Sequence, residues 1–168
     1  MILNRQRGVR VSIPKLEDFL ARARGALGVA SESLTVCLVT PAEMARWNRA
    51  YRGKNRPTDV LSFPTIVSDP RNEAKGRGQR VRPRRTPWNS ASPRAFSSAG
   101  FSKAYLGDIA IAPAVARDNA RRFGRTFDDE MRILILHGML HLMGYDHEMD
   151  NGQMERREQK LRKALGLT

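Results

Sequence analysis

The sequence predicts a single α/β (α+β) domain built around a small mixed sheet of about four strands, packed with about five helices. Two features of the pattern predict this class. Apolar runs of strand length mix with segments whose apolar residues recur every three or four positions, without strict alternation of the two. The helical segments are concentrated after residue 113. A chain of 168 residues suits one hydrophobic core, so we expect one domain over 1–168.

The N-terminal part of the chain predicts a helix followed by a strand. A short apolar segment opens the chain. A helical pattern then begins at Ser12 and Pro14 and stops before Gly28, which matches the preference for proline in the first turn and glycine just past the last. The near-continuous apolar run LTVCLV, at 34–39, has the length of a strand.

The middle and the end of the chain predict the remaining elements. Thr40 and Glu43 form a capping-box start for a helix that runs through Tyr51. The segments TDVLSF and LGDIAIA predict two further strands, at 58–63 and 106–112. Three helices are then expected, at 113–123 with Gly124 ending it, from 127 into a histidine-rich stretch with Thr126 as its cap, and at about 153–165.

A long basic insertion lies between the last two predicted strands, at about 65–105. It is rich in Arg, Ser, Pro and Gly and has no sustained apolar period, which is typical of a loop or a disordered insertion. Nine basic and two acidic residues give it seven of the formal net charge of +13. When Lys and Arg bind phosphates they release counterions, which favours binding, so we expect a polyanion as partner. RNA or DNA is the first expectation and an anionic membrane the second. A solvated insertion without a target is the alternative.

The chain has a single cysteine, Cys37, inside the apolar run at 34–39. An intrachain disulfide is therefore impossible, and the setting favours a buried thiol in a reducing compartment. No apolar run approaches the length of a membrane span, and the N-terminus lacks the apolar core of a signal peptide. We expect a cytoplasmic protein with no membrane partner.

All three histidines of the chain fall within LHGMLHLMGYDH, residues 136–147. His137 and His141 are four residues apart, which places them about 40° apart around a helix axis and roughly 6 Å along it, on one face. Gly144 follows, where a residue free to take a positive φ can end the helix and reverse the chain. That reversal would carry His147 back beside the other two.

Three neutral imidazoles on one Zn²⁺, with a fourth position left to water, are the arrangement of a catalytic zinc site. Such an ion lowers the pKa of its water towards about 7, so the pattern indicates a mononuclear zinc hydrolase with one zinc ion per chain. The alternative is that the histidines are ordinary surface or core residues. A lone HxxxH pair would favour that alternative, but a third histidine, a glycine at the reversal point and the apolar run MRILIL accompany this pair.

The histidine and glycine spacing, HGxxHxxGxxH, is that of metzincin metalloproteases, HExxHxxGxxH, so the expected domain is zincin-like. One residue differs. Gly138 stands where those proteases carry the glutamate that acts as general base on a peptide bond. Without that carboxylate, peptidase activity becomes doubtful, while metal binding is still allowed.

Three co-linear motifs closely resemble those of the YbeY family of bacterial endoribonucleases: YRGKNRPTDVLSFP at 51–64, YLGDIAIA at 105–112 and HGMLHLMGYDH at 137–147. The resemblance implies zinc-dependent cleavage of single-stranded RNA, in maturation of the 3′ end of the 16S rRNA precursor and in ribosome quality control. The implied partners are the rRNA precursor and the small ribosomal subunit. Members of the family are also linked to a small-subunit ribosomal protein and to the GTPase Era.

Carried over to this sequence, the resemblance implies that His137, His141 and His147 bind zinc and that Arg52 is the functional arginine of the site. A guanidinium suits that role because it can hold a phosphodiester through paired hydrogen bonds. It can also offset the negative charge that grows on the phosphate in the transition state.

Two acidic residues, Asp59 and Asp108, match family positions near the same cleft, with less defined roles. Asp59 is either part of the site or a cap or turn residue. Asp108 either accepts a hydrogen bond from the second nitrogen of a ligand histidine, as metal sites commonly arrange, or is structural. The insertion at about 65–105 is longer than the resemblance implies, so it either adds RNA-binding surface or is disordered.

Two rival functions stay open from the sequence alone. One is a zinc metalloprotease or another metal-dependent hydrolase. The other is a non-catalytic ribosome-assembly factor whose zinc is structural and whose basic insertion docks on rRNA. A fourth protein ligand on the metal would favour the assembly factor, and an open water position would favour catalysis.

Overall fold

The computed structural model describes residues 1–30, 33–65, 105–145 and 151–167, so most of the basic insertion lies outside it. These ranges confirm the predicted α/β class, with four strands and five helices and no helix long and apolar enough to cross a membrane. In chain order the elements are β1 (Ile2–Asn4), α1 (Ile13–Leu27), β2 (Leu34–Leu38), α2 (Pro41–Arg52), β3 (Val60–Pro64), β4 (Gly107–Ile111), α3 (Pro113–Arg122), α4 (Phe127–Leu142) and α5 (Gln153–Ala164).

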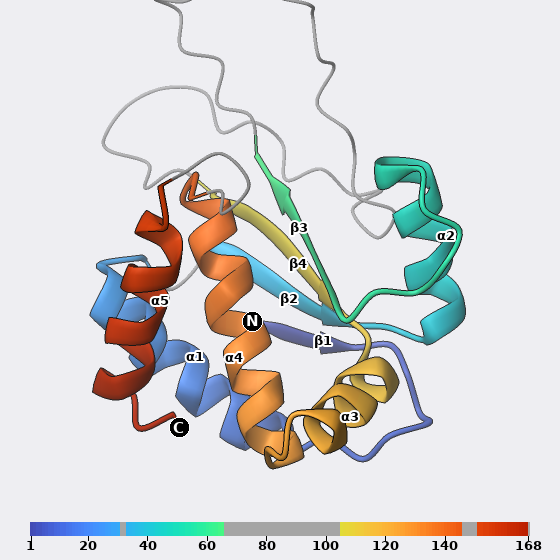
Figure 1. The fold of residues 1–168 in the computed structure, drawn as a ribbon, viewed down its shortest axis with the longest axis horizontal. Coiled ribbons are helices and arrows are strands. Elements are labelled where there is room, and N and C mark those ends of the chain that lie inside the picture. Colours follow the sequence, from blue (N-terminus) through green and yellow to red (C-terminus); the bar gives the residue numbers. More distant parts are fainter. Residues whose placement is uncertain (31–32, 66–104, 146–150, 168) are drawn as a thin grey trace, which may run out of the picture.

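The four strands form one mixed sheet in the order β1-β2-β4-β3 (Figure 1). β1, β2 and β4 run parallel, and β3 pairs antiparallel with β4, placing Ser62 opposite Ile109. Parallel neighbours need a crossover connection, which α1 supplies between β1 and β2. Of the described strands, β3 therefore forms the edge on the side away from β1.

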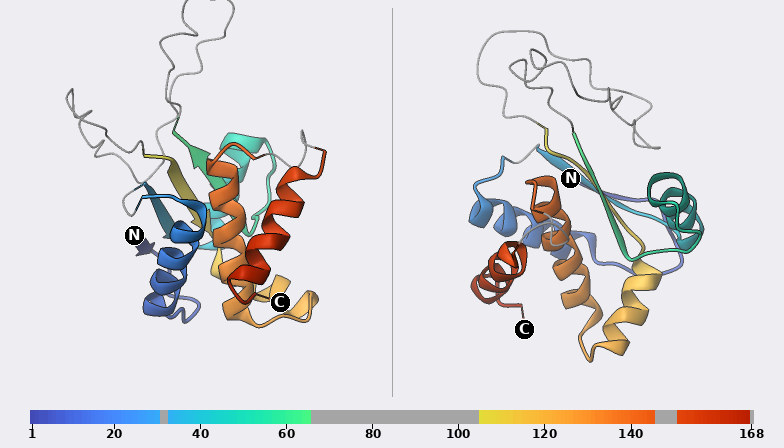
Figure 2. Two further views of the ribbon diagram at one scale, coloured as in Figure 1. Left: turned by 90° about the vertical axis from the view of Figure 1, so that its left-hand side faces the viewer. Right: turned by 45° about the horizontal axis from the view of Figure 1, so that its top comes forward.

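Side chains alternate between the two faces of the sheet and divide the core into two clusters. On one face, Val36 and Ile109 join the large cluster that α1, α4 and α5 complete. On the other face, Cys37 and Ala110 join a smaller cluster with Trp47 of α2. Figure 2 shows the same division, with α2 on one side of the sheet and α1, α4 and α5 on the other. The helix that carries the histidines thus lies in the thicker layer.

Local signals place the element ends close to the predicted positions. The side chain of Thr40 accepts a hydrogen bond from the Glu43 amide at 3.2 Å, and the Glu43 carboxylate accepts one from the Thr40 amide, which confirms the capping box. The strand predicted at 58–63 begins two residues later, at Val60. The Asp59 carboxylate accepts from the Val60 amide at 2.8 Å, which holds these residues in a turn before the strand begins.

Helix α4 and the sheet come very close at Gly138. A Cβ atom at this position would lie 2.8 Å from Cγ2 of Ile109, whose side chain is fully buried and has little room to move. The hydroxyl of Ser62, on β3, also donates a long hydrogen bond of 3.4 Å to the carbonyl oxygen of Gly138. The absence of a side chain at Gly138 therefore sets the distance between α4 and the sheet.

Gly138→Ala should lower the free energy of unfolding by about 1–2 kcal/mol, because overpacking costs about 1–3 kcal/mol and better helix propensity returns at most about 1 kcal/mol. Gly25→Ala is the matched control: Gly25 is an exposed glycine of α1 with nothing within 4 Å of an added Cβ. That variant should gain up to about 1 kcal/mol. Urea unfolding followed by circular dichroism measures both, and a stabilised Gly138→Ala would contradict the close packing.

Cys37 is a buried thiol, as the sequence predicts. It has 0% exposure, and burial raises the pKa of its thiol to about 11. The thiolate is the reactive form, so the folded protein should react with iodoacetamide near pH 8 at least about 100-fold more slowly than the urea-unfolded chain. Mass spectrometry of timed samples measures both rates. Equal labelling of the folded and unfolded chain would show that the strand does not protect Cys37.

Candidate metal centre

The last two turns of α4 carry two histidines whose rings face each other. Nε2 of His137 lies 3.1 Å from Nε2 of His141. The ring centroids are 4.6 Å apart and the ring planes meet at 78°. The helical spacing predicts this convergence, and the structure has it.

The arrangement of the two rings fits a shared metal ion. Two ligand nitrogens at about 2.1 Å from a tetrahedral Zn²⁺ are separated by about 3.4 Å. The distance of 3.1 Å between the two Nε2 atoms is close to that edge length. Imidazole is also the commonest side-chain ligand for this class of metal. The chemistry and the geometry of the pair are therefore those of two zinc ligands.

Helix α4 ends directly after the pair. Gly144 has a φ of 89°, its amide donates to the carbonyl oxygen of His141 at 3.0 Å, and the Tyr145 amide donates to that of Leu140 at 3.1 Å. These bonds end the helix in the left-handed conformation that glycine favours. The predicted helix end at this glycine is thus present. His147, the third predicted ligand, lies outside the described residues, and the described ranges alone contain no cluster of three or more His, Cys, Asp or Glu side chains placed to hold a metal.

A carboxylate that the sequence analysis did not single out contacts His137 from α5. Oε2 of Glu158 lies 3.0 Å from Nδ1 of His137, and Arg162 donates to Oε1 of the same carboxylate. Glu158 is buried, between the buried residues Met154 and Leu161 of the same helix. A charged residue within an apolar stripe is the one signal in the sequence that could have found it.

The charge of Glu158 is stabilised by its two partners. Burial alone would raise the pKa of this carboxyl, but the hydrogen bond with His137 and the positive charge of Arg162 bring the pKa below its usual value. Beside this contact, α5 borders an open hollow of about 370 Å³ that His137 also lines. The Nδ1 edge of His137 therefore faces α5 and the hollow, while its Nε2 edge faces His141.

Gly138 separates this site from that of a metalloprotease in a second way. A Cβ atom at this position would point at Ile109 in β4, 2.8 Å from its Cγ2 atom. A larger side chain at 138 would therefore require Ile109 or α4 to shift. Close packing thus favours glycine at this position, and glycine leaves no carboxylate where those proteases have their general base.

Arg52 is the last residue of α2, and its side chain is exposed. Gly53 follows in the left-handed conformation, with a φ of 69°, and ends the helix. α2 and α4 cover opposite faces of the sheet, so Arg52 and the histidine pair belong to different layers. Their helices nevertheless both end at the end of the sheet where β3 finishes (Figure 1). The structure thus brings His137 and His141 together and places Arg52 at the end of a helix on the other face of the sheet.

Asp59 has the turn role that the sequence left open. Besides the Val60 amide, its carboxylate accepts from the Thr58 hydroxyl at 3.1 Å and from Nδ2 of Asn119 at 2.9 Å. These contacts tie the start of β3 to α3. They account for an acidic residue at this position without a role in the chemistry.

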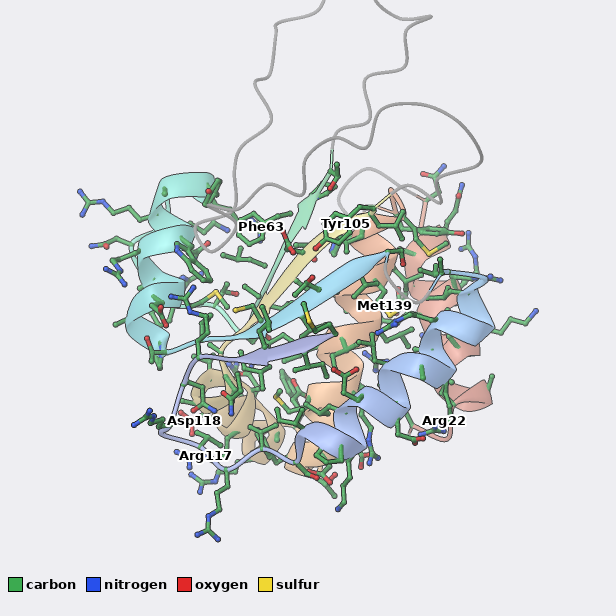
Figure 3. The ribbon with its side chains drawn as sticks, turned by 180° about the vertical axis from the view of Figure 1, so that it is seen from behind. Arg22, Phe63, Tyr105, Arg117, Asp118 and Met139 are labelled. Atoms are coloured by element: carbon green, nitrogen blue, oxygen red, sulfur yellow. The ribbon has the colours of Figure 1, made fainter. Side chains whose placement is uncertain are left out.

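Asp108 lies at the start of β4, against Tyr105. The Tyr105 phenol oxygen is 2.5 Å from Oδ1 of Asp108 and 2.9 Å from the hydroxyl of Thr35. Burial and the bond to Asp108 raise the pKa of this phenol, which keeps its proton. Figure 3 shows Tyr105 near this end of the sheet, with Phe63 on β3 between the strand and α2. One role that the sequence left open for Asp108 was to accept a hydrogen bond from the second nitrogen of a ligand histidine. At His137, it is Glu158 that makes this contact.

Comparison with known proteins assigns the chain to a family. The family profile described as Endoribonuclease YbeY matches residues 4–166. A protein of that name from Koribacter versatilis (strain Ellin345) is 38% identical over 167 residues, which cover 99% of this chain and 86% of the relative. Another from Staphylococcus aureus (strain JH9) is 33% identical over 157 residues, 92% of this chain and 86% of the relative.

The fold agrees with this assignment. A solution structure of a Thermotoga maritima protein matches with a TM-score of 0.56 and 26% sequence identity, covering 98% of this chain and 89% of the other. The profile, the relatives and the fold all extend over nearly the whole chain, so the resemblance is not limited to the histidine motif. The chain belongs to the YbeY family of endoribonucleases.

Proposed function

We propose that this chain is a zinc-dependent endoribonuclease that cuts single-stranded RNA, acting at the 3′ end of the 16S rRNA precursor and in ribosome quality control. Its family supports the endoribonuclease activity. The observation that carries the metal dependence is the pair of facing Nε2 atoms, of His137 and His141, 3.1 Å apart. The formal net charge of +13 suits a polyanionic substrate.

Each residue of the proposed site has one task. His137, His141 and His147 hold one zinc ion per chain, which when bound supplies a Lewis acid for an oxygen of the scissile phosphate. Arg52 binds the phosphodiester through its guanidinium and offsets the charge that grows in the transition state. Since α2 and α4 cover opposite faces of the sheet and both end where β3 finishes, we expect the RNA backbone to cross the end of that strand (Figure 1).

The proposed partners are the rRNA precursor and the small ribosomal subunit, with a small-subunit ribosomal protein and the GTPase Era. A cytoplasmic location fits an RNA substrate and the free thiol of Cys37. We treat 1–168 as one domain whose basic insertion, at about 65–105, adds positive charge for binding RNA.

Purified protein should cut a precursor rRNA, and a chelator should abolish the cleavage. His141→Ala should lose at least about 100-fold in rate because a metal ligand is gone, and Arg52→Ala about 100-fold because a charge-stabilising donor is gone. Arg49→Ala is the matched control, since Arg49 is an exposed arginine one turn earlier in α2. Equal cleavage by all four proteins would point to a contaminating nuclease and would contradict the proposed activity.

Deleting residues 71–94 removes eight basic residues and one acidic residue. If these side chains bind phosphates, the affinity for single-stranded RNA should fall and depend less steeply on salt. The logarithmic slope should decrease by about 0.7 for each phosphate that the shortened chain no longer neutralises. Fluorescence anisotropy across a salt series measures the slope for both proteins. An unchanged slope, with an unchanged circular dichroism spectrum, would mean that the insertion does not bind RNA.

A further inference from the structure

Glu158 is a buried carboxylate on a helix face that is otherwise apolar. It lies four residues after Met154 and three before Leu161, and all three are buried. Its two oxygens have separate partners, His137 for Oε2 and Arg162 for Oε1. A carboxylate that leaves water loses its hydration, which is tolerated only where bonds of this kind replace it. The position of Glu158 is therefore specific to these two partners.

The contact with Glu158 decides which nitrogen of His137 carries a proton. An ionised carboxylate only accepts hydrogen bonds, so Nδ1 of His137 must donate across the 3.0 Å contact. Nε2 of a neutral ring then keeps its lone pair, on the edge that faces His141. The same contact holds the plane of the ring. Glu158 thus prepares the one nitrogen of His137 that a metal ion shared with His141 would need.

We propose that Glu158 is a positioning residue of the metal centre: it holds His137 in the Nδ1-protonated tautomer, and Arg162 holds Glu158 in turn. This inference rests on the proposed metal site. The effect of Glu158 passes through His137, so α5 controls the geometry of the site without supplying a ligand from its described residues. Loss of such a partner typically lowers metal affinity about 10- to 100-fold.

Arg162 makes this role testable, because a guanidinium can only donate hydrogen bonds. In Glu158→Gln, the amide oxygen should turn to Arg162 and leave the NH₂ group facing Nδ1 of His137. His137 would then have to accept at Nδ1 and carry its proton on Nε2, the wrong tautomer for ligation. In Glu158→Ala, water from the open hollow can accept from Nδ1 instead. Glu158→Gln should therefore bind zinc more weakly than Glu158→Ala.

The experiment measures Zn²⁺ affinity of the metal-stripped full chain by competition with a chromophoric chelator, and the visible spectrum of the Co²⁺-loaded protein. Glu158→Ala should bind about 10-fold more weakly than wild type and Glu158→Gln about 100-fold more weakly. Adding Arg162→Met to Glu158→Gln should recover part of the loss, because the amide can then turn its oxygen to His137. Glu155→Gln, an exposed glutamate of α5, should bind like wild type. Urea unfolding of the metal-free proteins shows that each variant is folded.

The outcomes separate this inference from the proposed site. A wild-type chain that binds no zinc, or a His141→Ala variant that binds it equally well, would overturn the proposed metal site itself. Zinc binding by wild type with Glu158→Gln tighter than Glu158→Ala would show that Glu158 only docks α5 on α4. If Glu158→Ala does not fold, the zinc affinity of Glu158→Gln is compared with that of the double variant Glu158→Gln/Arg162→Met, and this comparison tests the proposal. No recovery in the double variant overturns the role of Arg162 and with it the proposal.

Discussion

The close approach of α4 to β4 at Gly138 is the contact on which the geometry of the site depends. The buried side chain of Ile109 meets the backbone of α4 with no side chain between them, so the helix cannot rotate without a clash or a void. His137 precedes this contact by one residue and His141 follows it by three. Most of the helix from Met131 to Leu142 is buried as well. Core packing therefore sets the direction of both imidazoles before any metal binds.

The features that the sequence predicts well are those that depend on neighbours in the chain. The capping box at Thr40, the spacing of His137 and His141, and the helix end at Gly144 each involve residues within one or two turns. Gly138 shows the limit of such reasoning. The motif around it shows that the glutamate of the metalloproteases is absent. Its packing role depends on Ile109 of β4, which is distant in the sequence and becomes a neighbour only in the fold.

The roles of Glu158 and Arg52 could not be predicted from the local sequence pattern, because neither role depends on residues nearby in the chain. Glu158 meets His137 across 21 residues and from a different helix, and only its position in the apolar stripe of α5 hints at a buried partner. Arg52 is an exposed arginine at a helix end, which physical reasoning from the sequence cannot tell from other arginines. The resemblance to the family named it, and the fold adds that α2, which Arg52 ends, covers the face of the sheet opposite to α4.

One buried carboxylate, Glu130, lies within α4 and another, Glu158, contacts it from α5, and the difference between them bears on what α5 does. Glu130 lies in the first turn, where the helix dipole favours a negative charge, and it pairs with Arg125 at 3.0 Å. That pairing accounts for Glu130 as a part of the fold. Glu158 lies instead on α5 beside His137, five residues before the end of α4 and far from the first turn where the dipole favours an anion.

A structural role alone accounts poorly for an acid at this place. Replacing a buried ion pair by apolar side chains of similar size is often neutral or stabilising, so a leucine or methionine would join α5 to α4 at least as well. The neighbours Met154 and Leu161 already do so. What an apolar side chain cannot do is accept a hydrogen bond from Nδ1 of His137. The contact with His137 thus accounts for the carboxylate, and in the proposed role α5 serves the metal site as well as the core.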